Sequence, residues 1–524
     1  MEQNRVAEFT FKTYSKQNDT LDFNVHFTAP NGSKKTVPCF FAGKNEFKAR
    51  YSSSVIGKHT FITECEAEKS VNGLQGEFEI SPYTGKNELY LHGGLDKKTN
   101  TKYLVQKDGT PFFWLADTWW MGLTTRISDD EFLELIKDRI EKGFNTVQIV
   151  AGLYPDMVWY DERGKNSAGY PWSEDFSELN PQYFDTMEKR IIMLCDNGIT
   201  PCIVGSWGFF IKTAGKTVLL RHWRNLIARF AAYPVAWCIA GEATMQFYDS
   251  KTDQEEYAKF AKRDWTDITK YVTDADPFKR LITIHPSAYG HNQVNDISLL
   301  DLDMLQTGHN GAMSLVPTMS MIKKTVELNQ MPVINSEVCY EGICGSSFED
   351  VQRYAFLSCI FLGACGHTYG ANGIWQLNGI DIPYGPSPHG AQWGLTSWKD
   401  AAQLLGSKHV GQCKKYITKF DWWKFEPHPE WVERSCSSEN IDGHFAAGIP
   451  GELVLIFKPN FGGDFWGEVN VSLEPCSDYK FERFNAVTGE ITDCVIITAD
   501  PEGKYKTPRV NFFGDWIYSF EKLR

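Results

Sequence analysis

The chain has 524 residues, and 53 basic against 66 acidic residues give it a formal net charge of -13. This length exceeds what one hydrophobic core normally holds, so we expect two or three domains. The acidic balance argues against a nucleic-acid partner, because phosphate binding needs concentrated Lys and Arg. No run of about 18 apolar residues occurs and the first residues do not resemble a leader, so we expect no membrane partner and a cytoplasmic protein.

Aromatic residues make up 14% of the chain, including 17 Trp. Flat apolar rings with a polar edge suit sugar rings, although most of these residues are expected to pack in cores. The 13 Cys are odd in number and lie in apolar segments such as LSCIFLGAC, which is typical of reduced, buried thiols. Neither CxxC nor HExxH occurs, so we expect no metal and no cofactor.

Both ends of the chain show a sequence pattern typical of β-domains. Residues 1–95 alternate short β-rich runs with clusters of Gly, Pro, Asn and Ser, and residues 411–524 do the same. This spacing predicts a small antiparallel β-sandwich at each end. Between them, residues 96–410 change to strand, helix, strand, so we expect three domains with these bounds.

The middle region predicts amphipathic helices between apolar strands. One helix should begin at Ser128, with Glu131 completing a capping box, and stop at Gly143; another should begin at Asn180 and Pro181. Eight segments are predicted strands: 111–117, 145–151, 200–206, 235–241, 281–286, 302–307, 332–337 and 366–370. Seven connections have room for a helix, which predicts an α/β fold built as a (β/α)8 TIM barrel. The alternative is a doubly wound open sheet, but neither GxGxxG nor GxxxxGK[ST] follows the first strand.

Two carboxylates at strand ends indicate the chemistry. A barrel carries its active site at the C-terminal ends of its strands, where the fourth strand ends on Glu242 and the seventh on Glu337. Glycosidic hydrolysis needs one acid to protonate the leaving oxygen and one carboxylate to attack the anomeric carbon or activate water. For either Glu alone, a cap or an ion-pair partner is the commoner explanation. Their joint placement on strands four and seven favours a catalytic pair.

Further strand-end residues are candidates for contacts with substrate hydroxyls and rings: Asp117, Trp119, Gln148, Trp207, His285, His309, Asn335 and Trp375. Asp117 closes the apolar run FFWLAD, where it could accept hydrogen bonds from a sugar or instead hold the first loop as a turn residue. The two histidines could equally be walls of the pocket. A sugar platform is an alternative to simple packing for three later aromatics, Trp422, Trp423 and Trp431.

Four motifs resemble a known group of enzymes. They are DGTPFFWLADTWWMGLTTRISDDEF, KGFNTVQIV, RFAAYPVAWCIAGE and MPVINSEVCYEG, in this order within residues 98–400. This region resembles the apiosidase-like glycoside hydrolases, which include glycoside hydrolase family 140. In that group the barrel is commonly flanked by an N-terminal β-sandwich of unknown function and a C-terminal β-sandwich with a collagen-binding label, from which we infer no collagen binding.

The resemblance implies a retaining, exo-acting glycosidase that removes a terminal sugar, such as an apiosyl or arabinofuranosyl residue, from plant-type oligosaccharides. Glu337 falls on the position of the nucleophile and Glu242 on that of the acid/base. One motif departs from the group. At the position where this chain has the Glu of AGE, the group usually carries Asp, and the extra methylene of Glu moves the carboxyl by about 1.5 Å.

Two alternatives therefore stay open. One is a family 5-like β-glycosidase acting on a pyranoside. The group around family 5 typically places Asn before the acid/base Glu, where this chain has Gly241. The other is a non-catalytic carbohydrate-binding protein on a barrel scaffold. In each case the expected partner is an oligosaccharide or glycoside, and the sequence predicts no particular oligomeric state.

Overall fold

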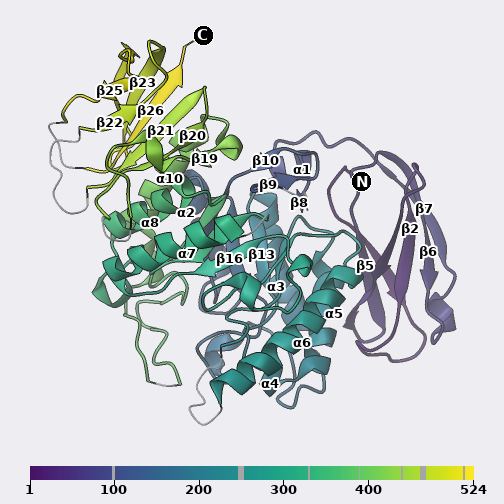
Figure 1. The fold of residues 1–524 in the computed structure, drawn as a ribbon. Helices are drawn as coiled ribbons and strands as arrows, with labels where there is room; N and C mark the ends of the chain where they lie inside the picture. The colour runs from purple at the N-terminus through teal and green to yellow at the C-terminus, as the bar shows by residue number, and fades with distance from the viewer. Residues whose placement is uncertain are drawn as a thin grey trace.

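The structure is a computed structural model, and it describes residues 1–96, 101–245, 253–328, 331–388, 390–437, 441–460, 468–510 and 514–523. A parallel sheet lies at the centre of the molecule, between a β region at each end of the chain (Figure 1). No helix in these ranges is both long and apolar enough to cross a bilayer.

The central sheet has eight strands in the order β15-β14-β13-β12-β11-β18-β17-β16. They are β11 (Trp114–Thr118), β12 (Thr146–Val150), β13 (Thr200–Val204), β14 (Ala236–Cys238), β15 (Ile282–Thr283), β16 (Asp303–Gln306), β17 (Val333–Glu337) and β18 (Gly366–Tyr369). Its two ends meet where the Asp301 N–H donates to the Ile282 carbonyl at 2.8 Å and the Thr283 hydroxyl donates to the Leu302 carbonyl at 2.8 Å. These bonds nearly close the sheet, and the predicted (β/α)8 barrel is confirmed.

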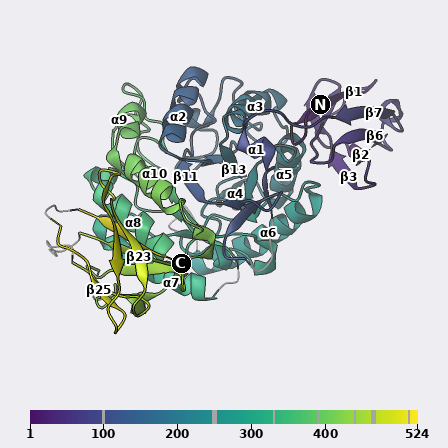
Figure 2. The same ribbon diagram turned by 90° about the horizontal axis from the view of Figure 1, so that it is seen from above.

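Helices surround the barrel (Figure 2). They are α2 (Asp129–Glu141), α3 (Pro181–Asp196), α4 (Phe210–Thr213), α5 (Lys216–Phe230), α6 (Gln254–Ala275), α7 (Leu315–Leu328), α8 (Glu349–Phe361), α9 (Trp398–Ala402) and α10 (Leu405–Ile417). The capping box of α2 forms as predicted, with Ser128 and Glu131 each accepting from the other's N–H. Between β15 and β16 the chain makes two 3-10 turns, so six of the seven predicted connections carry an α-helix.

The predicted strand 111–117 divides in two. Its first part, β10 (Pro111–Phe112), joins β9 (Leu104–Gln106) and β8 (Leu95–Asp96) in a small antiparallel sheet that follows α1 (Glu88–Leu91). The barrel strand β11 starts after Phe113, whose ring lies edge-on to Trp422 at 4.9 Å.

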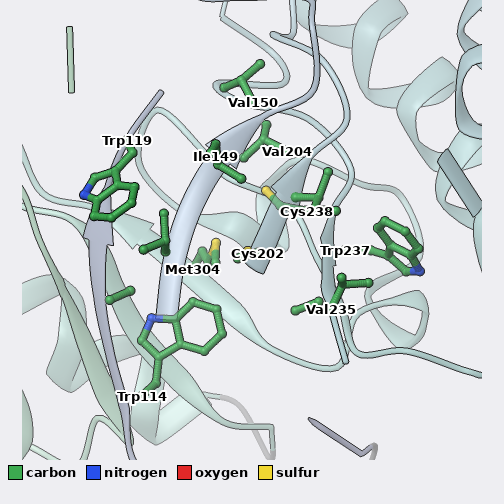
Figure 3. Packing of buried hydrophobic residues seen from close by; sticks show 14 of the residues in the cluster. Trp114, Trp119, Ile149, Val150, Cys202, Val204, Val235, Trp237, Cys238 and Met304 are labelled. Atoms are coloured by element: carbon green, nitrogen blue, oxygen red, sulfur yellow. The ribbon is translucent and has the colours of Figure 1, made fainter. Parts of the chain in front are cut away.

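Side chains from the strands fill the barrel. Trp114, Cys202 and Met304 come from three strands and are fully buried (Figure 3). Strands of a barrel are covered on both faces, inside by one another's side chains and outside by helices. This double burial explains why the sequence shows them as continuous apolar runs.

The N-terminal region is a pair of antiparallel sheets. One contains β3 (Lys34–Pro38), β2 (Asn24–Thr28), β6 (Gly57–Glu64) and β7 (Gln75–Ile80), and the other β1 (Ala7–Lys12), β5 (Glu46–Tyr51) and β4 (Phe40–Gly43). Phe9 of β1 and Phe27 of β2 pack between the sheets, with ring centroids 5.4 Å apart. Arg50 fastens this region to the barrel by pairing with Glu188 of α3 and donating to the Arg229 carbonyl of α5 at 2.8 Å.

The C-terminal region is also antiparallel. Its strands are β19 (Glu426–Pro427), β20 (Phe445–Ile449), β21 (Leu453–Lys458), β26 (Trp516–Lys522), β23 (Asp478–Asn485) and β24 (Ile491–Thr498), with β22 (Asn470–Ser472) and β25 (Lys504–Lys506) as a separate pair. Arg353 of α8 joins it to the barrel through Asp515 at 2.6 Å. The boundary expected after residue 410 falls within α10.

Candidate active site

The two predicted carboxylates lie in one cavity. Glu337 is the last residue of β17, and Glu242 follows β14, so both sit at the C-terminal end of the barrel. The cavity has a volume of about 170 Å³. Its lining consists of Trp120, Pro155, Asp156, Trp207, Glu242, Met245, His309, Glu337, Tyr340, Ile343, Trp375 and Trp393.

Gln306, at the end of β16, connects the two acids. Its Nε2 donates to Glu242 Oε1 at 3.0 Å and to Glu337 Oε1 at 2.8 Å. Because one atom contacts both oxygens, these oxygens are at most about 5.8 Å apart, within reach of the ~5–5.5 Å carboxyl spacing of retaining glycosidases. Inverting enzymes keep their carboxyl groups ~6.5–9.5 Å apart.

A β-bulge aims Glu337 at Gln306. Leu305 pairs with Asn335, but the next residue, Gln306, pairs with Glu337, which leaves Ser336 as an extra residue in β17. The bulge reverses the alternation of side chains, so Asn335 does not share the face of Glu337 as the sequence suggests. The Asn335 amide instead donates to Thr307 at 3.0 Å and contacts Cys359 of α8, away from the cavity.

Glu242 sits on an unusual backbone. Its φ is +47°, in the left-handed region that non-glycine residues rarely adopt. Trp207 pairs with Gly241 as an isolated β-bridge, and a Cβ on Gly241 would lie 2.3 Å from the indole ring. This close approach lets the Trp207 Nε1–H reach Glu242 Oε2 at 3.1 Å.

Burial and neighbouring charges separate the two carboxyls. Burial, reinforced by the charge of Glu337, raises the pKa of Glu242. Burial alone would also raise the pKa of Glu337, but hydrogen bonds and charge from His285 and His309 outweigh it and hold that pKa well below its usual range. Burial would lower the pKa of His309, but its contact with Glu337 raises it. One acid is thus biased towards the neutral form and the other towards the charged form.

Aromatic rings line the cavity around the pair. The Trp120 Nε1–H donates to the Tyr340 hydroxyl at 2.9 Å. The Tyr340 ring stacks on Trp375 with centroids 6.1 Å apart, and it lies 4.9 Å from the ring of His309. The walls therefore offer flat apolar faces beside the two acids, as a sugar ring requires.

A long segment after β18 forms one wall, and we call its described residues 370–388 and 390–397 the strap. The Arg163 guanidinium donates to the Tyr384 carbonyl at 3.1 Å and lies over the Tyr384 ring at 4.8 Å. Asp156, from the loop after β12, accepts from the Trp393 Nε1–H at 3.0 Å and from the Ser387 hydroxyl at 2.5 Å. These bonds hold Trp393 against the cavity.

The structure does not bring every candidate to the cavity. Asp117 is fully buried between the barrel and α2, where Arg139 pairs with it at 2.6 Å and the Trp119 Nε1–H donates to it at 2.8 Å. Gln148 donates to the Ser336 carbonyl at 2.9 Å inside the barrel. His285 is fully buried behind Glu337, with Nε2 lying 3.2 Å from Oε2.

Trp207, His309 and Trp375 do line the cavity, together with both Glu residues. The aromatics considered as a separate sugar platform make packing contacts. Trp422 packs on Phe113, and Trp431 stacks on His428 with centroids 3.9 Å apart.

Several residues of the site were not singled out from the sequence. Gln306 stands near the end of the sixth predicted strand, 302–307, but it was not among the candidates for substrate contacts. Trp120 and Tyr340 follow strand ends by two or three residues. Asp156 and Trp393 lie in loops, where no periodicity marks them. Within the described ranges, no three His, Cys, Asp or Glu side chains are placed to hold a metal ion.

Comparisons with known proteins agree with this architecture. The model of the apiosidase-like catalytic domain matches residues 98–424, and a domain of unknown function, DUF5060, matches residues 1–66. A search of curated proteins by sequence gives no match.

Solved structures share the fold. A candidate glycoside hydrolase from Bacteroides vulgatus ATCC 8482 is 20% identical, with a TM-score of 0.71 over 100% of this chain and 99% of its own. A glycoside hydrolase family 5 protein from the same organism is 20% identical, with a TM-score of 0.68 over 82% of this chain and 94% of its own. The family-model match covers more than half of the sequence. The chain therefore belongs to the apiosidase-like family, and it is a glycoside hydrolase.

Proposed function

We propose that the protein is a retaining, exo-acting glycoside hydrolase in which Glu337 is the nucleophile and Glu242 the acid/base. The observation that carries the proposal is the shared contact of both carboxylates with Gln306 Nε2, at 3.0 and 2.8 Å. This contact supports the short carboxyl spacing of a double displacement, because an inverting enzyme needs room for a water molecule between its acids.

The opposite pKa shifts support the assignment of roles. Glu337 is ionised and attacks the anomeric carbon, while Glu242 is protonated and gives its proton to the leaving oxygen as the glycosidic bond breaks. A covalent glycosyl-enzyme results. Glu242 then takes a proton from water, the water oxygen attacks the anomeric carbon, and the bond to Glu337 breaks.

The sign of each shift sets the pH dependence of kcat/KM. Activity needs ionised Glu337, so the acid limb lies below the usual range of a Glu carboxyl. It also needs protonated Glu242, so the alkaline limb lies above that range. We expect a bell-shaped profile whose two limbs are widely separated.

The strap supports exo action. Trp375 and Trp393 close one side of the cavity next to the acids, which favours a pocket for a terminal sugar over an open cleft. We propose a terminal furanosyl residue, such as apiosyl or arabinofuranosyl, on a plant-type oligosaccharide or glycoside, because the chain belongs to the apiosidase-like family.

A pyranoside-specific hydrolase is the second candidate. It is favoured by Glu242 itself, since the apiosidase-like motif usually carries the shorter Asp at this position. Here Trp207 and Gln306 each donate to one oxygen of the longer side chain.

The test is sugar release from a panel of furanosides and pyranosides, with wild type beside Glu242→Gln and Glu337→Gln. We expect the kcat of each variant to fall about 10²- to 10⁴-fold, which is the usual contribution of one general acid or base. NMR of the first anomer released reports retention. Full activity in either folded variant, or an inverted first product, would contradict the proposal. Cleavage of pyranosides alone would select the second candidate.

A further inference from the structure

We propose that Gln306 is a positioning residue that couples the two carboxylates and helps to hold the Glu242 carboxyl in place for proton transfer. This inference rests on the proposed function. It is carried by the two hydrogen bonds of one amide nitrogen and by the β-bulge that brings Glu337 beside Gln306.

Charge imposes the orientation of the Gln306 amide. Its Nε2 carries two hydrogens, which suffice for Glu242 and Glu337 at once. Rotation of the amide by 180° would place its oxygen, an acceptor, against two other acceptors. In the observed orientation the Gln306 Oε1 is buried and has no hydrogen-bond partner among the described residues. A protein seldom leaves such a group unsatisfied unless the opposite end of the side chain is needed.

The amide and an indole hold the two oxygens of the Glu242 carboxyl. An N–H group can only donate, so Glu242 Oε1 must offer a lone pair to Gln306. The Trp207 Nε1–H, 3.1 Å from Oε2, also only donates, and it takes a lone pair of the same oxygen. Each oxygen thus accepts from one N–H group, and the two bonds fix the orientation of the Glu242 carboxyl at the cavity.

Other titrating groups surround the pair, and Gln306 differs from them. His285 and His309 face Glu337, and the Tyr340 hydroxyl lies close to it. His and Tyr are titratable residue types. Gln306 carries no charge at any pH, so its replacement changes the coupling between the acids without adding or removing a titrating group.

The test replaces Gln306 with Met, which keeps the length of the side chain and removes the donor. The matched control is Gln352→Met, because the buried Gln352 Nε2 also bridges two acceptors, the carbonyls of Cys339 at 2.7 Å and Ser347 at 3.0 Å. Two readouts are used: the pH dependence of kcat/KM, and ¹³C NMR titration of Glu Cδ resonances assigned with Glu242→Gln and Glu337→Gln. The second readout needs no substrate.

In Gln306→Met, the titration of both carboxyls should move to higher pH by about one to two units, the usual worth of a hydrogen bond to a charged group. The limbs of the kcat/KM profile should move with them, and kcat should fall at least about tenfold. The control should move neither limb. If Gln306→Met does not fold, Gln306→Asn, whose amide is too short to bridge both acids, should give the same upward shifts.

Unchanged titrations of Glu242 and Glu337 in a folded Gln306 variant would overturn the coupling. Equal shifts of the Glu242 and Glu337 titrations in Gln352→Met would show that the effect comes from a general loosening of the protein interior and not from Gln306 itself. Failure of the proposed function looks different: Glu242→Gln or Glu337→Gln would keep turnover, whatever the titrations of the Gln306 variants show.

Discussion

Replacement of Arg139 by Met tests the ion pair at the end of the first barrel strand. The Arg139 Nε–H donates to Asp117 Oδ2 at 2.6 Å, and both side chains are fully buried. Without the guanidinium, Asp117 keeps the donors Thr118 N–H and Trp119 Nε1–H, each at 2.8 Å. Removing one partner of a buried ion pair costs about 3–5 kcal/mol. Because two donors to Asp117 remain, we expect the loss of unfolding free energy to be about 3 kcal/mol.

The assay is urea unfolding of wild type, Arg139→Met, Asp117→Asn and the double variant, followed by Trp fluorescence. Removing one partner is costly because the other charge stays buried without its pair. We therefore expect the loss of unfolding free energy in the double variant to be smaller than the sum of the two single losses, by more than about 1 kcal/mol. Lys259→Met is the control. Its exposed pair with Glu255 contributes only about 0.3–0.5 kcal/mol.

A loss below about 1 kcal/mol in Arg139→Met, or simple additivity of the two single variants, would refute this reasoning. The turnover rate per folded molecule distinguishes a structural role of Asp117 from a role in substrate binding. We expect it to stay at the wild-type level in Asp117→Asn, because Asp117 is not among the residues that line the cavity. A raised KM with unchanged stability would show that Asp117 binds substrate after all.

Two further predictions concern binding and pH. Trp393→Ala should raise KM about tenfold or more, with a smaller effect on kcat. The substitution removes an aromatic wall of the cavity, whose ring contacts contribute about 0.5–1.5 kcal/mol in addition to the buried apolar area. An unchanged KM in steady-state kinetics would contradict this prediction. Burial lowers the pKa of His222 to about 4 and of His367 to about 3, so the unfolded chain takes up protons first as the pH falls below about 6.5. Urea unfolding at pH 5.5 should therefore show about 1.4 kcal/mol less stability per histidine than at pH 7.5, and equal stability at the two pH values would contradict it.

The barrel and the meeting of Glu242 and Glu337 in one cavity could be predicted because both depend on local patterns. Continuous apolar runs between amphipathic helices mark strands covered on both faces, and Glu242 and Glu337 each end such a run. Asp117 ends a run in the same way, yet its role differs. Its partner Arg139 lies on α2, where it is fully buried while the neighbouring Ile140 is 39% exposed. Helical periodicity favours the opposite arrangement, so only the packed structure identifies the pair.

Other parts of the site depend on geometry that periodicity does not encode. Strict alternation places Asn335 and Glu337 on one face, and the bulge at Ser336 separates them. Asp156 and Trp393 are 237 positions apart in the chain and meet through one hydrogen bond. Such contacts join long loops whose paths are set by tertiary packing.

The bulge in β17 also limits how this sequence can change over time. If Ser336 instead joined the ladder opposite Gln306, regular alternation would turn Glu337 to the outer face of the barrel, whereas the deletion of Ser336 would remove the bulge and leave Glu337 opposite Gln306. Relatives that keep the same chemistry are therefore expected either to keep the bulge or to lose its extra residue, and in both cases to keep Glu337 opposite Gln306.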